Sequence, residues 1–468
     1  MDPAAWALAE LGTAQLGDAR RTRRLATLVT TLAARPAASV PVACGSWAAT
    51  KAADRFWDCA DVPPAAIRAA HQAATRARIP LHAPILVLQD TTLLDFTHQP
   101  ALVGTGPLAR PDQTGVLLHS ALAADLDGMP RGLLHQPQWA RAAAAVGQRH
   151  RRRPRPTAAK ERQRWRDTLV APQAALPPTT HVITVADREA DSDDLFAVPR
   201  PATSDLLIRA THNRRVDHEA RSRWDAVRQP PPAGLLPVAR RRHDDRPPRE
   251  AILTIRCRPL RRLPPRHHPR RTALAPIPVV AILAEEVAPP PGIPAIRWLL
   301  VTTRRVLSRA AAVACVRGYQ ARWLSERYPY GLKQGCRVAE LQLQTVERLE
   351  RAVATYALVA WRLLWLTYQA RAQPDQPCTI ALAPHEWQAR WCTIHHAPIP
   401  PPEPPPRWQA VRWIAQLGGF LGRAGDGEPG LRAIWQGLRR LEDIVATWLL
   451  LHSLSPPLTP PAQLVGKA

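Results

Sequence analysis

Four polar residues in one stretch of the chain have side chains and a spacing suited to chemistry at a phosphodiester. They lie at offsets 0, 3, 7 and 14 and are Tyr319, Arg322, Glu326 and Lys333. At about 100° per residue, these offsets fall within roughly 60° of one another on a helix. A carboxylate flanked by two cations and a phenol suits a metal ion beside a phosphate. Taken alone, the stretch would favour a solvated helix face with ion pairs four residues apart.

Two aspartates upstream turn this stretch into a candidate catalytic site. Asp90 ends the apolar run 84–90, and Asp187 ends the apolar run 181–187. Each run contains β-branched residues and predicts a buried strand with a carboxylate at its tip. Such an acid is often structural, but with Glu326 the two form three hard oxygen ligands that suit two Mg²⁺ ions on a scissile phosphate. We therefore expect Asp90, Asp187 and Glu326 to be catalytic residues and metal ligands, with Mn²⁺ as a substitute for Mg²⁺.

The charge of the chain indicates a polyanionic partner. It contains 63 Lys and Arg against 38 Asp and Glu, a formal net charge of +25, and its pI is near 11.2. Nucleic acid is the usual partner for such a surplus. Only four lysines occur, so nearly all of the charge is arginine, which grips phosphate in a bidentate fork. The high content of Ala, Arg and Pro also indicates a G+C-rich coding sequence. Part of the excess of positive charge is attributable to that coding bias.

Several other classes of site are not supported by the sequence. The seven cysteines are widely spaced without a Cys-x-x-Cys, which indicates reduced thiols rather than a disulfide framework. Cys392 with His395, and the histidine pair at 267–268, lack the second half of a zinc site. The apolar run 352–368 contains an arginine and predicts a buried helix rather than a membrane span, and no signal peptide is visible.

Proline-rich breaks and changes of apolar spacing predict three regions. Residues 1–70 have helical spacing and crowd into one turn four arginines for which we expect DNA contact, namely Arg20, Arg21, Arg23 and Arg24. Residues 71–370 mix strands and helices, with strands expected at 84–90, 115–123, 130–136, 181–187 and 204–210, a helix at 159–175, a basic loop at 149–156 and a β-rich insertion at about 228–303. Residues 371–468 are helical, and the apolar spacing over 431–449 fits either packing within the chain or a dimer helix.

Motifs along nearly the whole chain resemble one family, the bacterial DDE transposases of the IS-four group, and within it most closely those of the Tn-five type. The matching segments occur in order at residues 16–25, 54–57, 90–92, 132–135, 139–141, 187–191, 298–303, 319–333 and 413–420. The resemblance implies an α/β fold with an RNase H-like mixed-sheet catalytic core and a β-rich insertion. It also implies an N-terminal helical DNA-binding domain and a C-terminal helical dimerisation domain on either side of that core.

The resemblance assigns further residues to DNA. It implies that Arg322 and Lys333 bind phosphate, that Tyr319 donates a hydrogen bond to a phosphate oxygen, and that Arg209 contacts the transposon end. Trp298 would stack on a base flipped from the duplex, although a core aromatic on a strand is an equal alternative. Arg188, Glu189 and Asp191 are expected to support Asp187 rather than to bind metal.

The resemblance also implies the function. The chain would bind the terminal repeats of its own element and cut and join DNA in a metal-dependent, cut-and-paste reaction with a hairpin at the excised ends. Its partners would be double-stranded DNA, both element ends and target, and a second copy of the chain in a synaptic complex. We expect a cytoplasmic bacterial protein associated with the nucleoid, with no membrane partner and no small-molecule substrate. The alternatives are a catalytically silent copy that only binds DNA as a dimer, and a basic RNA-binding or structural protein.

One departure from the family pattern lies between Glu326 and Lys333. Pro329 and Gly331 stand where the family has helix-forming residues. A proline inside a helix removes a hydrogen bond and clashes with the preceding turn, at a cost of about 3 kcal/mol or more. The helix therefore either kinks beyond Glu326 or ends there and displaces Lys333, and we expect the kink.

Overall fold

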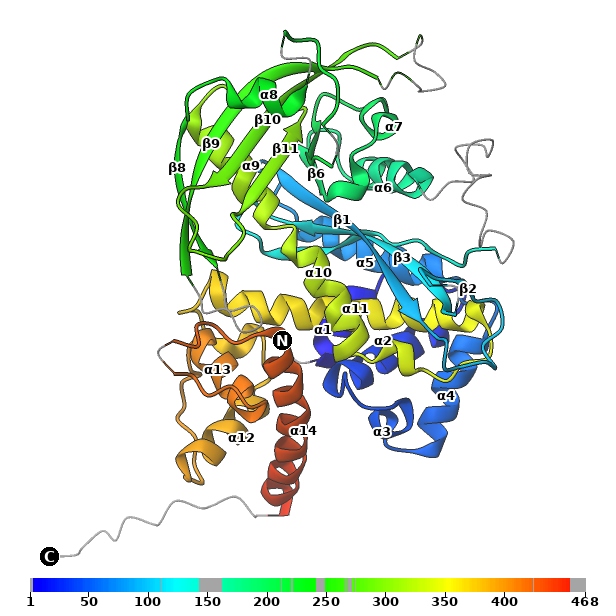
Figure 1. The fold of residues 1–468 in the computed structure, drawn as a ribbon. Coiled ribbons are helices and arrows are strands. Elements are labelled where there is room, and N and C mark those ends of the chain that lie inside the picture. Colours follow the sequence, from blue (N-terminus) through cyan, green and yellow to red (C-terminus); the bar gives the residue numbers. More distant parts are fainter. Residues whose placement is uncertain are drawn as a thin grey trace, which may run out of the picture.

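A computed structural model of the chain consists of a large sheet with helical regions contributed by both ends of the sequence (Figure 1). It describes residues 3–110, 112–142, 162–211, 213–219, 222–240, 249–264, 266, 272, 274–423 and 425–454. The basic loop expected at 149–156 and the histidine pair at 267–268 lie outside these residues.

The N-terminal region is helical, as its apolar spacing predicts. Its helices are α1 (Pro3–Leu11), α2 (Ala19–Ala34), α3 (Val40–Cys44), α4 (Trp47–Asp58) and α5 (Pro64–Arg78). Asp18 caps α2 by accepting a hydrogen bond from the backbone N–H of Arg20 at 2.7 Å, which satisfies a donor at the helix start. Helix α5 crosses the expected domain boundary at residue 70, and the division into domains stays a prediction.

The central region is built on five strands in the expected places. They are β1 (Ile85–Asp95), β3 (Thr114–Ala124), β4 (Pro130–His135), β6 (Val182–Ala186) and β7 (Ser204–Arg209). Their order across the sheet is β4-β3-β1-β6-β7, with β3 antiparallel to β1 and β6 and β7 parallel to it. The short strands β2 (Gly106–Pro107) and β5 (Gln138–Trp139) pair with β3. This mixed sheet between helical regions confirms the expected α/β, RNase H-like fold class.

The insertion continues this sheet rather than forming a separate one. Its strands are β8 (Gly234–Arg240), β9 (Arg249–Arg262), β10 (Ile277–Glu286) and β11 (Arg297–Thr302). Each is antiparallel to the next, and β11 pairs with β7, so that the described strands form one sheet of 11 strands. The insertion is thereby joined by backbone hydrogen bonds to β7, the neighbour of β6.

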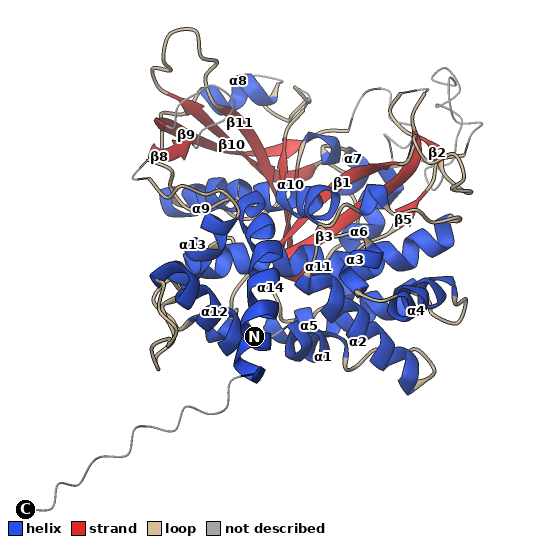
Figure 2. Ribbon diagram, turned by 90° about the horizontal axis from the view of Figure 1, so that it is seen from below, coloured by secondary structure: helices blue, strands red, loops and turns tan. Residues whose placement is uncertain are grey.

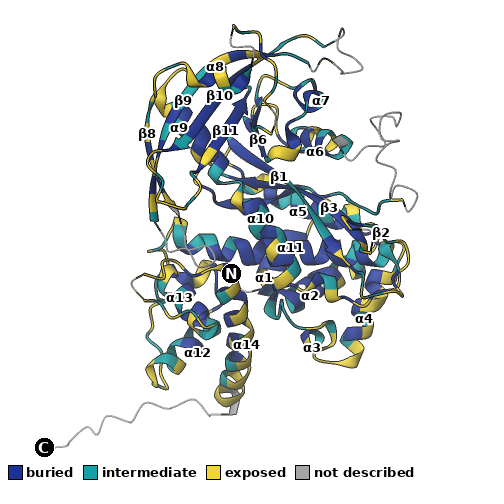
Figure 3. Cartoon of the chain, in the orientation of Figure 1, coloured by how far each residue is buried: buried dark blue, intermediate teal, exposed yellow. Residues whose placement is uncertain are grey.

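Helices cover both faces of the sheet. Helix α6 (Arg162–Ala175) lies on one face, and α9 (Arg309–Gln320), α10 (Trp323–Tyr330) and α11 (Val346–Ala372) lie on the other. Helix α11 is buried over most of its length (Figure 3), as the apolar run 352–368 predicts. No helix among the described residues is long and apolar enough to cross a membrane.

A buried ionic contact ties the N-terminal helices to the sheet. Glu10 on α1 bonds to His71 Nδ1 and to Arg78 on α5, the latter at 2.7 Å. His71 Nε2 accepts the backbone N–H of Leu133 in β4 at 2.9 Å, which joins α5 to that strand. Burial raises the pKa of Glu10, but His71 and Arg78 outweigh it and lower that pKa to about 2.

The C-terminal region contains α12 (Pro384–His395), α13 (Arg407–Leu417) and α14 (Leu431–Leu454). These helices and those of the N-terminal region lie on the same side of the sheet, in front of it in the view from below (Figure 2). Apolar residues over most of α14 are buried against the rest of the chain, which confirms packing within the chain for that part of the helix. All cysteines are free, as expected.

Candidate active site

Asp90 and Asp187 are neighbours on two parallel strands. The last paired residues of β1 and β6 are Gln89 and Ala186, and the two aspartates follow one position later on strands about 4.8 Å apart. Because side chains alternate along a strand, both aspartates point to the face that α10 covers. The convergence of these two acids therefore follows from the register of the sheet.

Asp90 does not lie at a strand tip, and that prediction was wrong. Strand β1 continues to Asp95 because its pairing with β3 continues, with Asp90 opposite Ser120. The polar run from Gln89 onward resembled a strand end in the sequence. In the structure it marks only the point where β6 stops pairing with β1. Asp187, by contrast, directly follows β6 and caps the short helix 188–190 by accepting the N–H of Glu189 at 2.8 Å.

Glu326 lies on a helical path that is not one uniform α-helix. Tyr319 is in α9, Glu326 is in α10, and Arg322 lies between the two helices. The N–H of Arg322 bonds to the carbonyl of Tyr319 at 3.1 Å, and that of Ser325 bonds to the carbonyl of Arg322 at 2.8 Å. These are tighter turns of the 3₁₀ kind, which rotate the chain further per residue than an α-helix does. The prediction of one regular α-helical stripe was therefore wrong in its geometry.

Pro329 lies inside α10 and does not end the helical path. The N–H of Gly331 donates to the carbonyl oxygens of Arg327 and Tyr328, and a π-helical turn over Gly331–Gly335 follows. The N–H of Cys336 closes this turn on the carbonyl of Gly331 at 2.8 Å. The helical path thus continues past Pro329, with irregular turns after it, so the expectation of a distorted but continuing helix is confirmed.

Lys333 stays within electrostatic reach of the candidate acids despite this distortion. Burial lowers the pKa of its ammonium group, whereas Asp90 and Asp95 act to raise it. This half-buried ammonium group interacts electrostatically with Asp90. It therefore lies close to the place where a substrate phosphate would meet the carboxylates. Its position is thus compatible with the expected phosphate contact.

The three carboxylates interact strongly enough to change the acidity of Asp90. Burial and the charge of Asp187 raise its pKa to about 7, with a further contribution from Glu326. Arg322 and the N–H of Thr91 act in the opposite direction. Two nearby carboxylates that both disfavour ionisation of a third are the signature of a crowded acidic site.

The three carboxylates are not arranged around one shared metal position in this structure. Glu326 is ion-paired with Arg322 at 2.5 Å, and no group of three or more His, Cys, Asp or Glu side chains in the described residues is arranged to hold a metal ion. In this structure the positive charge beside Glu326 is the guanidinium group of Arg322, whereas the expected metal ions would provide that charge in the active site. The metal-ligand assignment stays a prediction.

Trp298 and Tyr319 form a buried aromatic pair beside this site. Their ring centroids are 5.8 Å apart in an edge-to-face arrangement, and both side chains belong to the main core. Trp298 on β11 is therefore a core aromatic in this structure, the alternative left open by the sequence. The hydroxyl of Tyr319 is buried and has no hydrogen-bond partner among the described residues, which leaves it a donor for an incoming ligand.

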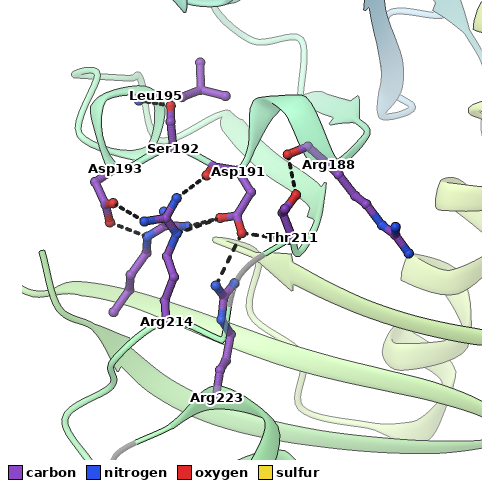
Figure 4. Close-up of polar contacts among 9 residues, drawn as sticks. Arg188, Asp191, Ser192, Asp193, Leu195, Thr211, Arg214 and Arg223 are labelled. Carbon is purple, nitrogen blue, oxygen red and sulfur yellow. Dashed lines mark hydrogen bonds and ion pairs between the residues drawn. The ribbon is translucent and has the colours of Figure 1, made fainter. Parts of the chain in front are cut away.

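A buried ion cluster holds the loop that follows Asp187 (Figure 4). Asp191 pairs with Arg262 at 2.8 Å and with Arg214 and Arg223 at 3.4 Å, and Asp193 pairs with Arg262 at 2.7 Å and Arg214 at 2.9 Å. Burial raises the pKa of Asp191, but the guanidinium groups of Arg262 and Arg223 outweigh it and lower that pKa to about 2. The cluster links this loop to β9 of the insertion through Arg262.

The arginines of this cluster could not be found from the sequence. Asp191 was expected to support Asp187, and this stays a prediction, since the ion pairs of Asp191 among the described residues are all with arginines. Its partners come from the segment after β7, from α8 (Arg223–Arg228) and from β9, far apart in the chain and without a shared motif. Only the pairing of the insertion with the core sheet brings them together.

The remaining arginines assigned to DNA differ in their surroundings. Arg20, Arg23 and Arg24 are exposed on α2, whereas Arg21 pairs with Asp61 at 2.5 Å and donates to the carbonyl of Leu16 at 3.2 Å. Arg209 at the end of β7 is partly exposed and donates to the carbonyl of Arg297 at 3.4 Å. DNA contact by these residues stays a prediction, and Arg21 already has a structural role.

Two family models match the ends of the chain. Residues 3–62 match the family described as Transposase DNA-binding, and residues 358–455 match the family described as Transposase Tn5 dimerisation domain. The first match spans α1 to α4 with the exposed arginines of α2, and the second runs from within α11 through α14. They support DNA and a second copy of the chain as partners. Together with the mixed sheet between them, these matches support the interpretation of the chain as a Tn5-like bacterial transposase.

Proposed function

We propose that this transposase is an active DDE enzyme that binds the terminal repeats of its own element, cleaves the strands there and joins them to target DNA. The observation that supports this most is the adjacent register of Asp90 and Asp187 beneath the helix that carries Glu326. Electrostatic coupling of Asp90 to both other carboxylates adds to it. Three acids drawn from segments this distant, whose charges oppose ionisation of Asp90, are costly to a fold unless they serve a ligand.

The donor set fits divalent cations. Asp90, Asp187 and Glu326 offer hard oxygen ligands, and the raised pKa of Asp90 reflects a local excess of negative charge that two Mg²⁺ or Mn²⁺ ions would offset. When bound, such ions lower the pKa of an attacking hydroxyl and stabilise the leaving alkoxide. Glu326 would exchange its contact with Arg322 for this role.

Side chains around the acids would hold the DNA strand in line for the reaction. Arg322, released from Glu326, and Lys333 would neutralise the non-bridging phosphate oxygens. The hydroxyl of Tyr319 would donate a hydrogen bond to one of these oxygens. Water would serve as the first nucleophile, and the freed 3′-hydroxyl would then attack a second strand, which permits excision by way of a hairpin.

Recognition and pairing would be carried by the ends of the chain. The exposed arginines of α2 would bind the phosphate backbone at the element end. The C-terminal helices would pair two copies so that both ends are cut within one synaptic complex.

Alanine variants test the assignment directly. Asp90→Ala, Asp187→Ala and Glu326→Ala should each abolish nicking of the inverted repeats that flank the gene, because ligation of metal and recognition of the ends use different residues. Each should keep end binding within about threefold of wild type. The measurement is a gel assay of nicking with Mg²⁺, run beside a mobility-shift titration on the same DNA.

Glu340→Ala provides a matched control, because Glu340 is an exposed acid shortly after Lys333 that pairs only with Arg337 among the described residues. This variant should cleave like wild type. Retained nicking by any of the three test variants would remove that residue from the site. A wild-type protein that binds the repeats but never cuts them in Mg²⁺ or Mn²⁺ would favour the catalytically silent copy.

A further inference from the structure

We propose that a buried hydrogen-bond bridge from Tyr328 through Gln136 to Ser120 positions the helix of Glu326 over Asp90. The amide Nε2 of Gln136 donates to the hydroxyl oxygen of Tyr328 at 2.7 Å and to that of Ser120 at 3.0 Å. The bridge rests on the proposed function, because its effect is exerted on the carboxylates assigned there. It makes these three residues positioning residues that do not themselves touch substrate.

The bridge lies directly beside the candidate acids. Ser120 is the cross-strand partner of Asp90, so the two side chains share one face of the sheet with Cβ atoms about 5 Å apart. Tyr328 follows Glu326 by two positions on α10, and Gln136 follows the end of β4. The bridge thus connects the helix that bears one acid to the strands that surround another.

All three side chains are removed from water. Tyr328 is 1% exposed, Gln136 3% and Ser120 8%. A buried polar group costs free energy unless it is hydrogen-bonded, so a shift of α10 that broke these contacts would be opposed. The amide oxygen of Gln136 has no partner among the described residues. Reversal of the amide would let both hydroxyls donate to that oxygen, so the bridge exists in either orientation.

Helix α10 has a particular need for such an anchor. It is eight residues long, it follows tight 3₁₀ turns and it leads into a π-helical turn. Pro329 inside it has no N–H to donate to the carbonyl of Ser325, one turn earlier. The side chain of Ser325 bonds to the carbonyl of Arg322 at 2.7 Å and makes only a long contact of 3.5 Å with Asp90. The backbone alone therefore fixes the position of Glu326 weakly, and the bridge fixes it from outside the helix.

Tyr328→Phe tests the bridge by deleting one oxygen atom from the full chain bound to its inverted repeats. The Mn²⁺ concentration for half-saturation, followed by electron paramagnetic resonance, should rise about fivefold or more because Glu326 is less well placed. Single-turnover nicking should fall about tenfold at low Mg²⁺ and recover in part at high Mg²⁺. End binding should stay as in wild type.

Two further variants separate positioning from general stability. Tyr356→Phe removes the hydroxyl of an equally buried tyrosine on α11 that packs on Trp57, and it should keep the wild-type Mn²⁺ affinity. Gln136→Leu removes the same bridge from its middle. The double variant with Tyr328→Phe should be no worse than Gln136→Leu alone, because the two changes delete one shared contact.

Each outcome decides the proposal. Wild-type Mn²⁺ affinity in Tyr328→Phe, whether or not its thermal stability falls, would overturn the bridge as a positioning device. If Tyr328→Phe does not fold, the affinity of Gln136→Leu decides in the same way. If the wild type takes up Mn²⁺ but never nicks DNA, the proposed activity fails while the Mn²⁺ affinities still judge the bridge. A wild type that takes up no Mn²⁺ contradicts both.

Discussion

A buried carboxyl group beside two other acids is harder to ionise, because burial and their negative charges oppose its own. Asp90 is such a group. Burial and Asp187 raise its pKa to about 7, from an ordinary value near 3.8. Between these two pH values the folded chain keeps a proton that the unfolded chain has released. The free energy of unfolding therefore falls as pH rises across this window, by up to about 1.4 kcal/mol per pH unit. The contribution is fully present below about pH 4 and is lost above pH 7.

Asp90→Asn should reveal this effect, because asparagine has a similar shape and cannot ionise. In the presence of a chelator the variant should match wild type in Tm near pH 4 and exceed it at pH 8, by on the order of 2–4 kcal/mol in free energy of unfolding as an upper bound. Mn²⁺ at pH 8 should raise the Tm of wild type and reduce the difference. Thermal melts across pH, with and without metal, measure both effects. A Tm difference that is constant with pH would contradict the crowding of charge at Asp90.

At the scale of single elements, the sequence predicted what depends on local pattern. The apolar runs before Asp90 and Asp187 predicted the strands, and the spacing of polar residues over 319–333 predicted the helical segment that carries Glu326. The sequence could not give the extension of β1 beyond Asp90, because that depends on pairing with a strand about 30 residues later. The sequence also could not predict Gln136 and Arg262 as side-chain partners, because only tertiary contacts bring them to the site.

Pro329 belongs to this scale, since its effect is on the shape of one helix. Because the helical path continues past it and Lys333 remains near Asp90, Pro329→Ala should change the nicking rate by less than about tenfold, or 1.4 kcal/mol of barrier. Alanine would restore a backbone donor for the carbonyl of Ser325, but the helical path already continues past residue 329 without it. Single-turnover nicking of the inverted repeats measures the change. A gain of tenfold or more would mean that the proline displaces Lys333 from its working position.

The whole molecule presents two opposing demands, because two copies must approach one another while each carries a formal charge of +25. Free copies repel at low ionic strength, and DNA of opposite charge lowers this repulsion when it binds both. Pairing should therefore be weaker for the free chain than for the chain bound to its inverted repeats. Added salt should strengthen self-association of the free chain while it weakens DNA binding.

The end of α14 is the surface on which this pairing can be tested. The helix buries its earlier apolar residues within the chain, whereas Leu449 and Leu450, which lie inside the segment matched to the dimerisation family, are 44% and 59% exposed. The double variant Leu449→Glu with Leu450→Glu should raise the dissociation constant of the dimer at least tenfold. In a symmetric dimer both copies bury these leucines, so each substitution removes apolar contact area on both sides. Leu126→Glu, at an equally exposed leucine before β4, should leave it unchanged. Analytical ultracentrifugation with and without the repeats measures the constant, and single-end binding should survive in both variants. A double variant that still pairs normally on DNA would move the dimer contact away from α14.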